Sequence, residues 1–263
     1  MKRNRFGSWL AFALGAIYFL LPLIATFEFS LRIRREGYTF DAYGIVLADA
    51  RFQETFLYST ALSVATIIVG AIIVVPTAYF VQLRLRRLRQ VVEFLTLMPL
   101  VIPAIVLVFG YLRIYNSSSI LPFTAHEFTT DLLLVFGCVT LALPYMYRSV
   151  DAGLQAIDVR TLTEAAENLG AGTFIILWRV ILPNLRAAVL SGAFLTFAIV
   201  IGEFVLASLL DRPAFGPYLQ LIGASRAYEP SALAIIAFIV TWTCMGLIQI
   251  VGRQARGSAP RGH

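Results

Sequence analysis

Long uncharged runs of apolar residues, separated by short charged segments, set the pattern of this chain. Most of these runs reach the roughly 18 to 20 residues that a helix needs to cross the hydrocarbon core of a membrane. We expect six spans, over residues 9–31, 55–83, 94–113, 129–148, 187–210 and 230–252. Because these spans take up most of the chain, the pattern predicts an all-α membrane protein in which residues 1–263 form a single domain.

Composition and charge support a membrane location. Hydrophobic residues make up 59% of the chain and charged residues 14%, against about 25% charged in soluble domains. With six spans and an inner N-terminus, fourteen of the 21 lysines and arginines fall on the cytoplasmic side. We therefore expect a multi-pass protein of the bacterial inner membrane, with both termini cytoplasmic and no nucleic-acid partner. Arg32, Arg34 and Arg35 lie on the opposite side and weaken this assignment.

Several kinds of chemistry are excluded by residues that the chain lacks. The only lysine is Lys2, so a phosphate-binding loop ending in Lys-Ser or Lys-Thr cannot form. His126 and Glu127 lack the second histidine of a metalloprotease motif, since position 130 is Thr130. We expect no catalytic residue, no metal site and no cofactor in this chain, so any ATP and magnesium would be bound by a separate subunit.

A long loop, residues 149–186, separates the fourth and fifth predicted spans. Thr161 and Glu164 have the spacing of a capping box, which predicts a short helix over residues 162–169. Gly170 can adopt the left-handed conformation that ends such a helix. A helix of two turns is unstable alone in water, so we expect packing against the rest of the protein to hold it.

The short helix has the features of a docking surface. Ala165 and Ala166 allow close approach by another protein, and Glu164 and Glu167 share a helix face. The apolar segment 173–182 can lie against the spans. We therefore expect the loop to form a projection that is fixed in the helix bundle. The alternative is that the two glutamates only form a solvated face of the short helix.

These residues resemble the cytoplasmic signature of the permease subunits of type I binding-protein-dependent ABC importers. That signature reads Glu-Ala-Ala, three residues, Gly, nine residues, Ile-x-Leu-Pro. The matching residues here are Glu164, Ala165, Ala166, Gly170, Val180, Leu182 and Pro183. Val180 in place of isoleucine is the one departure, and the position of the loop between the fourth and fifth spans also agrees.

The resemblance implies a type I importer fold, with six transmembrane helices and a cytoplasmic coupling helix. It implies that Leu169 and Leu182 brace the coupling helix from the membrane side. The expected partners are a dimer of ATP-binding subunits, a second permease (identical or homologous), a periplasmic substrate-binding protein and membrane lipid. The residues expected to dock the ATP-binding subunit are Glu164, Ala165, Ala166, Glu167, Gly170, Leu182 and Pro183.

An ionisable residue inside a span is costly, so it is a candidate for function. Glu203 lies within the fifth predicted span, and Gly202-Glu203-Phe204 resembles permeases for oxyanions, ferric ion, polyamines and aminophosphonates. Our hypothesis is that these three residues line the substrate pathway or its gate. The alternative is that Glu203 pairs with Arg113 or Arg212 and only fixes helix packing.

Two further segments are candidates for movement and binding. Met98 begins a stretch with prolines at 99 and 103, which predicts a bending point in the third span and a place for Met98 at a gate. The stretch 218–230, which includes Tyr218, mixes polar and aromatic residues. It suits contact with a binding protein, but it could equally be inert.

The favoured interpretation is the pore subunit of an ATP-driven importer. Acidic Glu203 and Glu28 favour a cationic or zwitterionic solute, polyamine-like or aminophosphonate-like, although Glu28 lies near a membrane interface. One alternative is the same role for an oxyanion or ferric ion. The alternative from another class is a stand-alone secondary transporter that uses Glu203.

Overall fold

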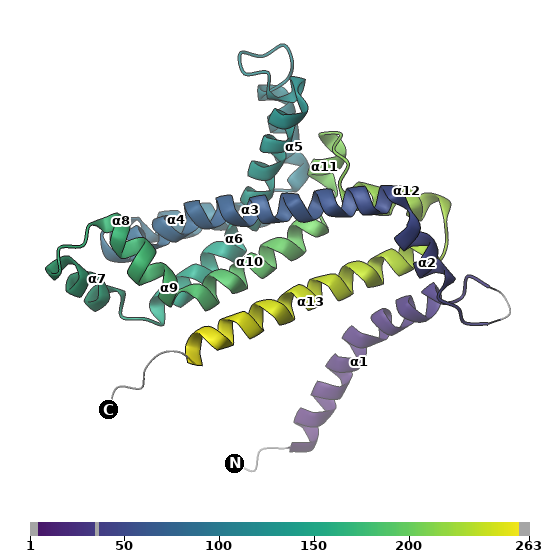
Figure 1. The fold of residues 1–263 in the computed structure, drawn as a ribbon, viewed down its shortest axis with the longest axis horizontal. Coiled ribbons are helices and arrows are strands. Elements are labelled where there is room, and N and C mark those ends of the chain that lie inside the picture. Colours follow the sequence, from purple (N-terminus) through teal and green to yellow (C-terminus); the bar gives the residue numbers. More distant parts are fainter. Residues whose placement is uncertain (1–4, 35–36, 258–263) are drawn as a thin grey trace. The chain divides into compact units, whose positions relative to one another are not determined.

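The computed structural model describes residues 5–34 and 37–257, and every regular element in these stretches is a helix (Figure 1). Helices suit an apolar chain because they pair backbone groups locally where no water is available. The predicted all-α fold is confirmed. The helices are α1 (Arg5–Ser30), α2 (Asp41–Ala48), α3 (Ala50–Leu83), η1 (Arg86–Leu88), α4 (Arg89–Val101), α5 (Ala104–Ile114), η2 (Phe123–Ala125), α6 (Glu127–Gln155), α7 (Val159–Asn168), α8 (Thr173–Ile175), the π-helix η3 (Ile176–Ile181), α9 (Leu182–Asn184), α10 (Arg186–Ile201), α11 (Val205–Leu209), α12 (Phe215–Ser225) and α13 (Glu229–Gly257).

Three described helices are long and apolar enough to cross a membrane, and two bent helix pairs raise this number to five. The three are Gly7–Ser30, Ala50–Leu83 and Glu127–Gln155. A shorter apolar helix covers Glu229–Cys244. The number of six spans therefore stays a prediction.

The third predicted span, 94–113, is not one helix. α4 and α5 meet at an angle of 97° around Ile102 and Pro103. Pro103 has no backbone N–H, and it forces the preceding Ile102 out of the helical region, to ψ 120. The predicted bending point is confirmed, and the extent of the third span stays a prediction.

The fifth predicted span, 187–210, is interrupted as well. α10 ends at Ile201 and α11 begins at Val205, so Gly202, Glu203 and Phe204 lie in a break between two helices. The helix that contains the fourth predicted span, α6, extends beyond 129–148 at both ends, from Glu127 to Gln155.

The chain divides into two compact units, residues 55–217 with 241–263, and residues 1–54 with 218–240. The larger unit holds two buried apolar clusters. One gathers side chains of α3, α6, α7 and η3, and the other gathers side chains of α3, α5, α6, α10 and α11. α6 contributes to both clusters, and α10 packs closely along it. A methyl group at Gly153 would clash with the side chain of Ala188, which shows how near the two backbones lie.

The smaller unit contains α1, α2 and the start of α13. Glu28 pairs with Arg32, and Arg34 pairs with Asp41, so local carboxylates balance two of the arginines that weakened the predicted orientation; Arg35 lies outside the described residues. Tyr218 is buried and donates to Asp49 at 2.9 Å. The idea that Tyr218 forms part of an exposed docking surface is therefore wrong.

Candidate functional site

α7 begins at a different residue from the one that the capping-box pattern indicates. Asp158 is the N-cap, and its carboxylate accepts from the amide of Thr161 at 3.2 Å and from the Thr161 hydroxyl at 2.6 Å. Glu164 binds Arg160 at 2.8 Å instead of reaching back. The capping-box prediction is wrong because the carboxylate of Asp158 already accepts this amide. The Thr161 hydroxyl and then its amide lower the pKa of Asp158.

The end of α7 follows the prediction. Gly170 has φ +79, in the left-handed region. Its amide donates to the carbonyl of Glu167 at 2.9 Å, and the amide of Ala171 donates to the carbonyl of Ala166 at 3.0 Å. These two bonds form a Schellman motif, which satisfies the last carbonyl groups of the helix.

One face of α7 is fixed to the larger unit. Val159, Thr163 and Ala166 are buried on this face. The hydroxyl of Thr163 donates to the carbonyl of Val159 at 2.7 Å, so the Tyr79 hydroxyl, 3.3 Å away, is placed to donate to Thr163. Ala166 is 8% exposed and belongs to the apolar cluster. The prediction that both alanines face outward is therefore wrong for Ala166, whose methyl group helps to attach the helix.

The opposite face of α7 is open. Glu164, Ala165 and Glu167 are exposed together, and Glu167 reaches Arg84 beyond the end of α3 at 3.5 Å. Leu169 is 88% exposed. It does not brace the helix as the family resemblance implied, because the C-terminal turn points it away from the cluster. We did not predict from the sequence that Leu169 belongs to this open face, although its position next to Gly170 was a usable signal.

The segment after α7 anchors it. Ile176, Leu177 and Ile181 of η3 are buried, and Leu182 packs against the same cluster, which confirms that this segment lies against the helix bundle. Leu182 and Pro183 both lie in α9, next to this buried segment. Their part in binding an ATP-binding subunit stays a prediction.

A pocket of about 290 Å³ lies between α3 and this anchoring segment. Its lining is apolar throughout, with Pro76 on one side and Leu177 and Trp178 on the other. Such a pocket offers no charged or hydrogen-bonding partner to a polar solute.

Glu203 is buried, at 8% exposure, and it caps a helix. One carboxylate oxygen accepts from the amide of Leu206 at 2.8 Å, and the other accepts from the amide of Ala207 at 3.0 Å. The carboxylate thus satisfies two amides at the N-terminus of α11, where a negative charge is favourable. Among the described contacts Glu203 has no ion pair with Arg113 or Arg212, so the pairing alternative is wrong. A role for Gly202, Glu203 and Phe204 in the substrate pathway stays a prediction.

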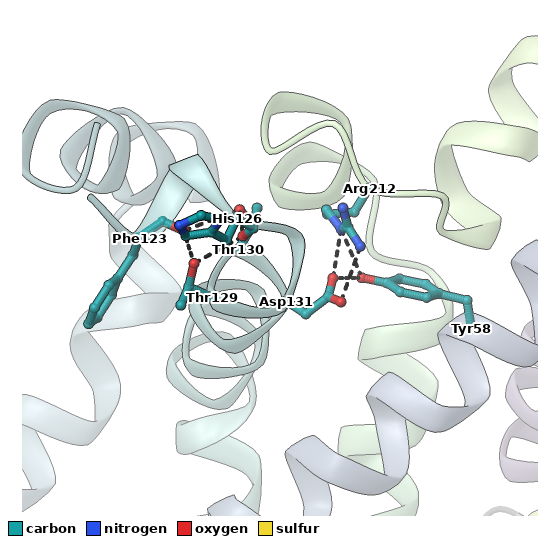
Figure 2. Close-up of polar contacts among 7 residues, drawn as sticks. All are labelled: Tyr58, Phe123, His126, Thr129, Thr130, Asp131 and Arg212. Atoms are coloured by element: carbon teal, nitrogen blue, oxygen red, sulfur yellow. Dashed lines mark hydrogen bonds and ion pairs between the residues drawn. The ribbon is translucent and has the colours of Figure 1, made fainter. Parts of the chain in front are cut away.

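Arg212 has another partner. Its guanidinium donates to both carboxylate oxygens of Asp131, at 2.6 and 3.1 Å, and the Tyr58 hydroxyl donates to the same carboxylate at 2.5 Å. Figure 2 shows Arg212 and Tyr58 converging on Asp131. We did not predict this group from the sequence, although Asp131 is an ionisable residue within the fourth predicted span, which makes it a candidate for function.

Met98 lies on α4, four residues before the bend, and is 37% exposed. No described contact joins Met98 to Glu203, so the structure does not bring the two candidate gate residues together. The described residues also contain no group of three His, Cys, Asp or Glu side chains placed to hold a metal ion.

Solved structures share this fold. A bacterial ABC transporter for alginate, solved with an alginate pentasaccharide-bound periplasmic protein, superposes with a TM-score of 0.73 at 14% identity, over 95% of this chain and 96% of that chain. An amino acid ABC transporter superposes with a TM-score of 0.56 at 20% identity, over 82% of this chain and 99% of that chain. At these identities the likeness shows the fold alone.

Curated relatives are permeases. The spermidine/putrescine transport system permease protein PotC of Escherichia coli is 31% identical over 124 residues, which is 46% of this chain and 47% of the relative. PotB of Haemophilus influenzae is 26% identical over 77% of this chain and 74% of its own length. A probable molybdenum ABC transporter permease protein of Haloferax volcanii is 32% identical over 49% of this chain and 48% of its own length. The chain thus spans about half the length of PotC and of the molybdenum permease.

The family described as "Binding-protein-dependent transport system inner membrane component" matches residues 74–251. The match includes α7, the η3 segment and the helix break at Glu203. It covers more than half of the chain, and the chain therefore belongs to this family of inner-membrane transport permeases.

Proposed function

We propose that this chain forms one half of the pore of an ATP-driven importer, and that α7 is the surface through which a separate ATP-binding subunit moves it. The observation that carries the proposal is the two-faced construction of α7. One face is buried in an apolar cluster, while Glu164, Ala165 and Leu169 lie open on the other. A partner that binds the open face can move the helices that hold the buried face.

The chemistry of the open face suits a protein partner. Burying an exposed leucine contributes about 1.5–3 kcal/mol, and the carboxylates on either side of Ala165 can pair with basic residues. A second permease, identical or homologous, would complete the pore. A periplasmic binding protein would deliver the solute, as the alginate complex supports by analogy of fold.

We propose a small cationic solute of the polyamine type. The names of PotC and PotB support this choice, and so does the carboxylate of Glu203 in a break between helices. The molybdenum relative supports the oxyanion alternative, so an uptake assay should offer both classes.

Co-purification tests the docking role. The full chain, carrying an affinity tag, is expressed with its ATP-binding subunit as wild type, Leu169→Asp or Glu164→Arg. Leu169→Asp should reduce the retained subunit about tenfold or more, because it places a charge where an apolar contact forms. Ile120→Asp is the matched control, since Ile120 is 99% exposed and lies in a different loop.

Uptake into proteoliposomes tests the rest of the proposal. Labelled spermidine should accumulate only with ATP inside, with the ATP-binding subunit and with a binding protein, and excess molybdate should not compete. Full retention of the subunit by both α7 variants, together with wild-type uptake, would refute α7 as the docking surface. Uptake without any nucleotide would refute the ATP-driven mechanism.

A further inference from the structure

α11 is too short to hold itself in place. It has five residues, Val205–Leu209, and a helix of this length is not stable without outside contacts. Those contacts come from both of its ends and from the helix beneath it, all within the larger unit.

At its N-terminal end, Glu203 satisfies the amides of Leu206 and Ala207. Gly216, which follows α11 in the chain, packs against the backbone of Glu203 and Phe204 so closely that any side chain there would clash with the Glu203 carbonyl. The break before α11 is therefore fixed by backbone contacts.

At its C-terminal end, α11 is joined to its neighbours by an ion pair and by the buried side chain of Leu210, and the segment that follows is joined to α3 by a bond from the Phe215 amide to the Ser59 hydroxyl at 2.8 Å. Asp211 takes a positive φ of 53, and the amide of Arg212 donates to the carbonyl of Ala207 at 2.9 Å. This turn directs the Arg212 side chain to Asp131 of α6 and Tyr58 of α3 (Figure 2). The guanidinium also lies 5.9 Å from the centre of the Tyr58 ring, within the range of a cation–π contact. Arg212 thereby connects α11 to two long helices.

The acceptor of this ion pair is placed in advance. The turn before Asp131 is fixed by the hydroxyls of Thr129 and Thr130, which donate to the carbonyls of Phe123 and His126 (Figure 2). These bonds fix the backbone turn that carries Asp131 without any contact from Arg212.

Beneath α11 the packing is close, since Leu206 is 0% and Ala207 1% exposed. Leu206 fits against Gly137 of α6, where an added Cβ would lie 3.0 Å from the leucine side chain. Ala207 and Cys138 belong to the same buried cluster, and both are small. The Asp131 side chain is 35% exposed, so water can replace the ion pair when Arg212 leaves.

We propose that Tyr58, Asp131 and Arg212 form a latch that holds α11 against α3 and α6 and opens during transport. The inference rests on the proposed function, because it assigns these residues to positioning a segment of the pore. While the latch is closed, the amides of Leu206 and Ala207 in α11 donate to the carboxylate of Glu203. When it opens, the C-terminal end of α11 can move away from α3 and α6, which uncovers the cluster that contains Cys138.

Cys138 reports the position of α11, because it is 1% exposed and lies in the cluster that α11 covers. The complex with the ATP-binding subunit is prepared with Cys244→Ala, which leaves one cysteine in this chain, and with a cysteine-free partner subunit. The rate of labelling by N-ethylmaleimide is then measured. Arg212→Ala and Asp131→Ala should each raise the rate about tenfold or more, and Tyr58→Phe should raise it less.

Reversal of the charges separates a latch from general loosening. The double variant Asp131→Arg with Arg212→Asp should restore protection of Cys138. Arg89→Ala is the matched control, since it removes another partly exposed ion pair, to Asp151, that joins two helices of the same unit. A wild-type labelling rate in Arg212→Ala, or an equal rise in Arg89→Ala, overturns the latch.

Addition of ATP tests whether the latch opens during the transport cycle. In the otherwise unmodified complex, ATP should raise the labelling rate of Cys138 several-fold, and an equal rate with and without ATP overturns opening during the cycle. The measurement needs no solute. A failure to import any solute would therefore refute the proposed function and leave the labelling result intact, whereas wild-type labelling in an importing complex would refute the latch alone.

Discussion

Replacement of Glu203 separates two roles that the sequence could not distinguish. A carboxylate that only binds solute or ions can be lost without harm to the folded protein. A carboxylate that caps α11 cannot, because the amides of Leu206 and Ala207 have it as their acceptor, at 2.8 and 3.0 Å. We therefore predict that Glu203→Ala and Glu203→Gln lower stability as well as transport.

The size of the effect follows from the number of amides released. A buried N–H left without an acceptor costs about 1–3 kcal/mol, so Glu203→Ala should cost about 2–6 kcal/mol. Glu203→Gln keeps one acceptor oxygen but turns an NH2 group toward the second amide, and it should cost about half as much. In a chain of this size, about 1 kcal/mol corresponds to roughly 2–4 °C in the melting temperature.

Thermal unfolding of the purified complex in detergent, followed by the fluorescence of tryptophan, measures these differences. The expected order of melting temperatures is wild type, then Glu203→Gln, then Glu203→Ala, with a total decrease of roughly 4–24 °C. Glu54→Ala is the control, since Glu54 of α3 is exposed and belongs to no proposed site, so it should shift the midpoint by about 1 °C or less. Loss of uptake in Glu203→Ala with an unchanged midpoint would refute the capping role and favour a residue that acts only on solute.

The remaining predictions concern α7 and its packing. Asp158→Ala should reduce the amide-exchange protection of α7, whereas Thr161→Ala should reduce it less, and equal losses would support the capping box instead. The pKa of Asp158 is lower in the folded protein than in the unfolded chain, where it is near 4. Its carboxylate should therefore stabilise α7 above pH 4, and this stabilisation should be lost as the pH falls through the lower pKa of the folded protein. Amide exchange of α7 measured at pH 2 and at pH 6 compares the two conditions. Gly170→Ala, at φ +79, should cost about 1–2 kcal/mol and weaken co-purification, in contrast to Gly172→Ala, whose φ is −72. Gly153→Val should prevent correct folding, because the valine side chain would clash with Ala188, and the variant should lose its monodisperse peak in size-exclusion chromatography. Gly110→Val is the control, since a side chain at residue 110 would meet open space.

Local features of the fold could be predicted from the sequence, because one or two neighbouring residues determine them. Pro103 bends the third span by removing a donor and restricting Ile102, and Gly170 ends α7 because it has no Cβ. The apolar segment after α7 had to be buried somewhere, and Ile176 and Ile181 lie in the core as expected.

Features that depend on contacts between residues far apart in the chain could not be predicted from the sequence. The bond from Arg212 to Asp131 joins residues 81 apart in the chain. Hydropathy alone makes the break at Glu203 look like the middle of a span, since a single charge in an apolar run does not show where helical hydrogen bonding stops. Whether Ala165 or Ala166 faces outward depends on where α7 begins. The helix begins at Val159, after the N-cap Asp158, and not at residue 162 as the capping-box pattern predicted.

One helix, α6, connects the two apolar clusters that the proposals concern. α6 has 29 residues, a length of about 43 Å at 1.5 Å per residue. Tyr147, Val150 and Leu154 at one end pack in the cluster that holds α7, and Leu134 and Cys138 near the other end pack in the cluster beneath α11. Because α6 and α10 are in close contact at Gly153 and again where Gly192 meets Met146, neither helix can bend without opening that contact. A displacement imposed on α7 would therefore reach Asp131 as a movement of the whole helix, and the ion pair to Arg212 is the polar contact that this movement would strain.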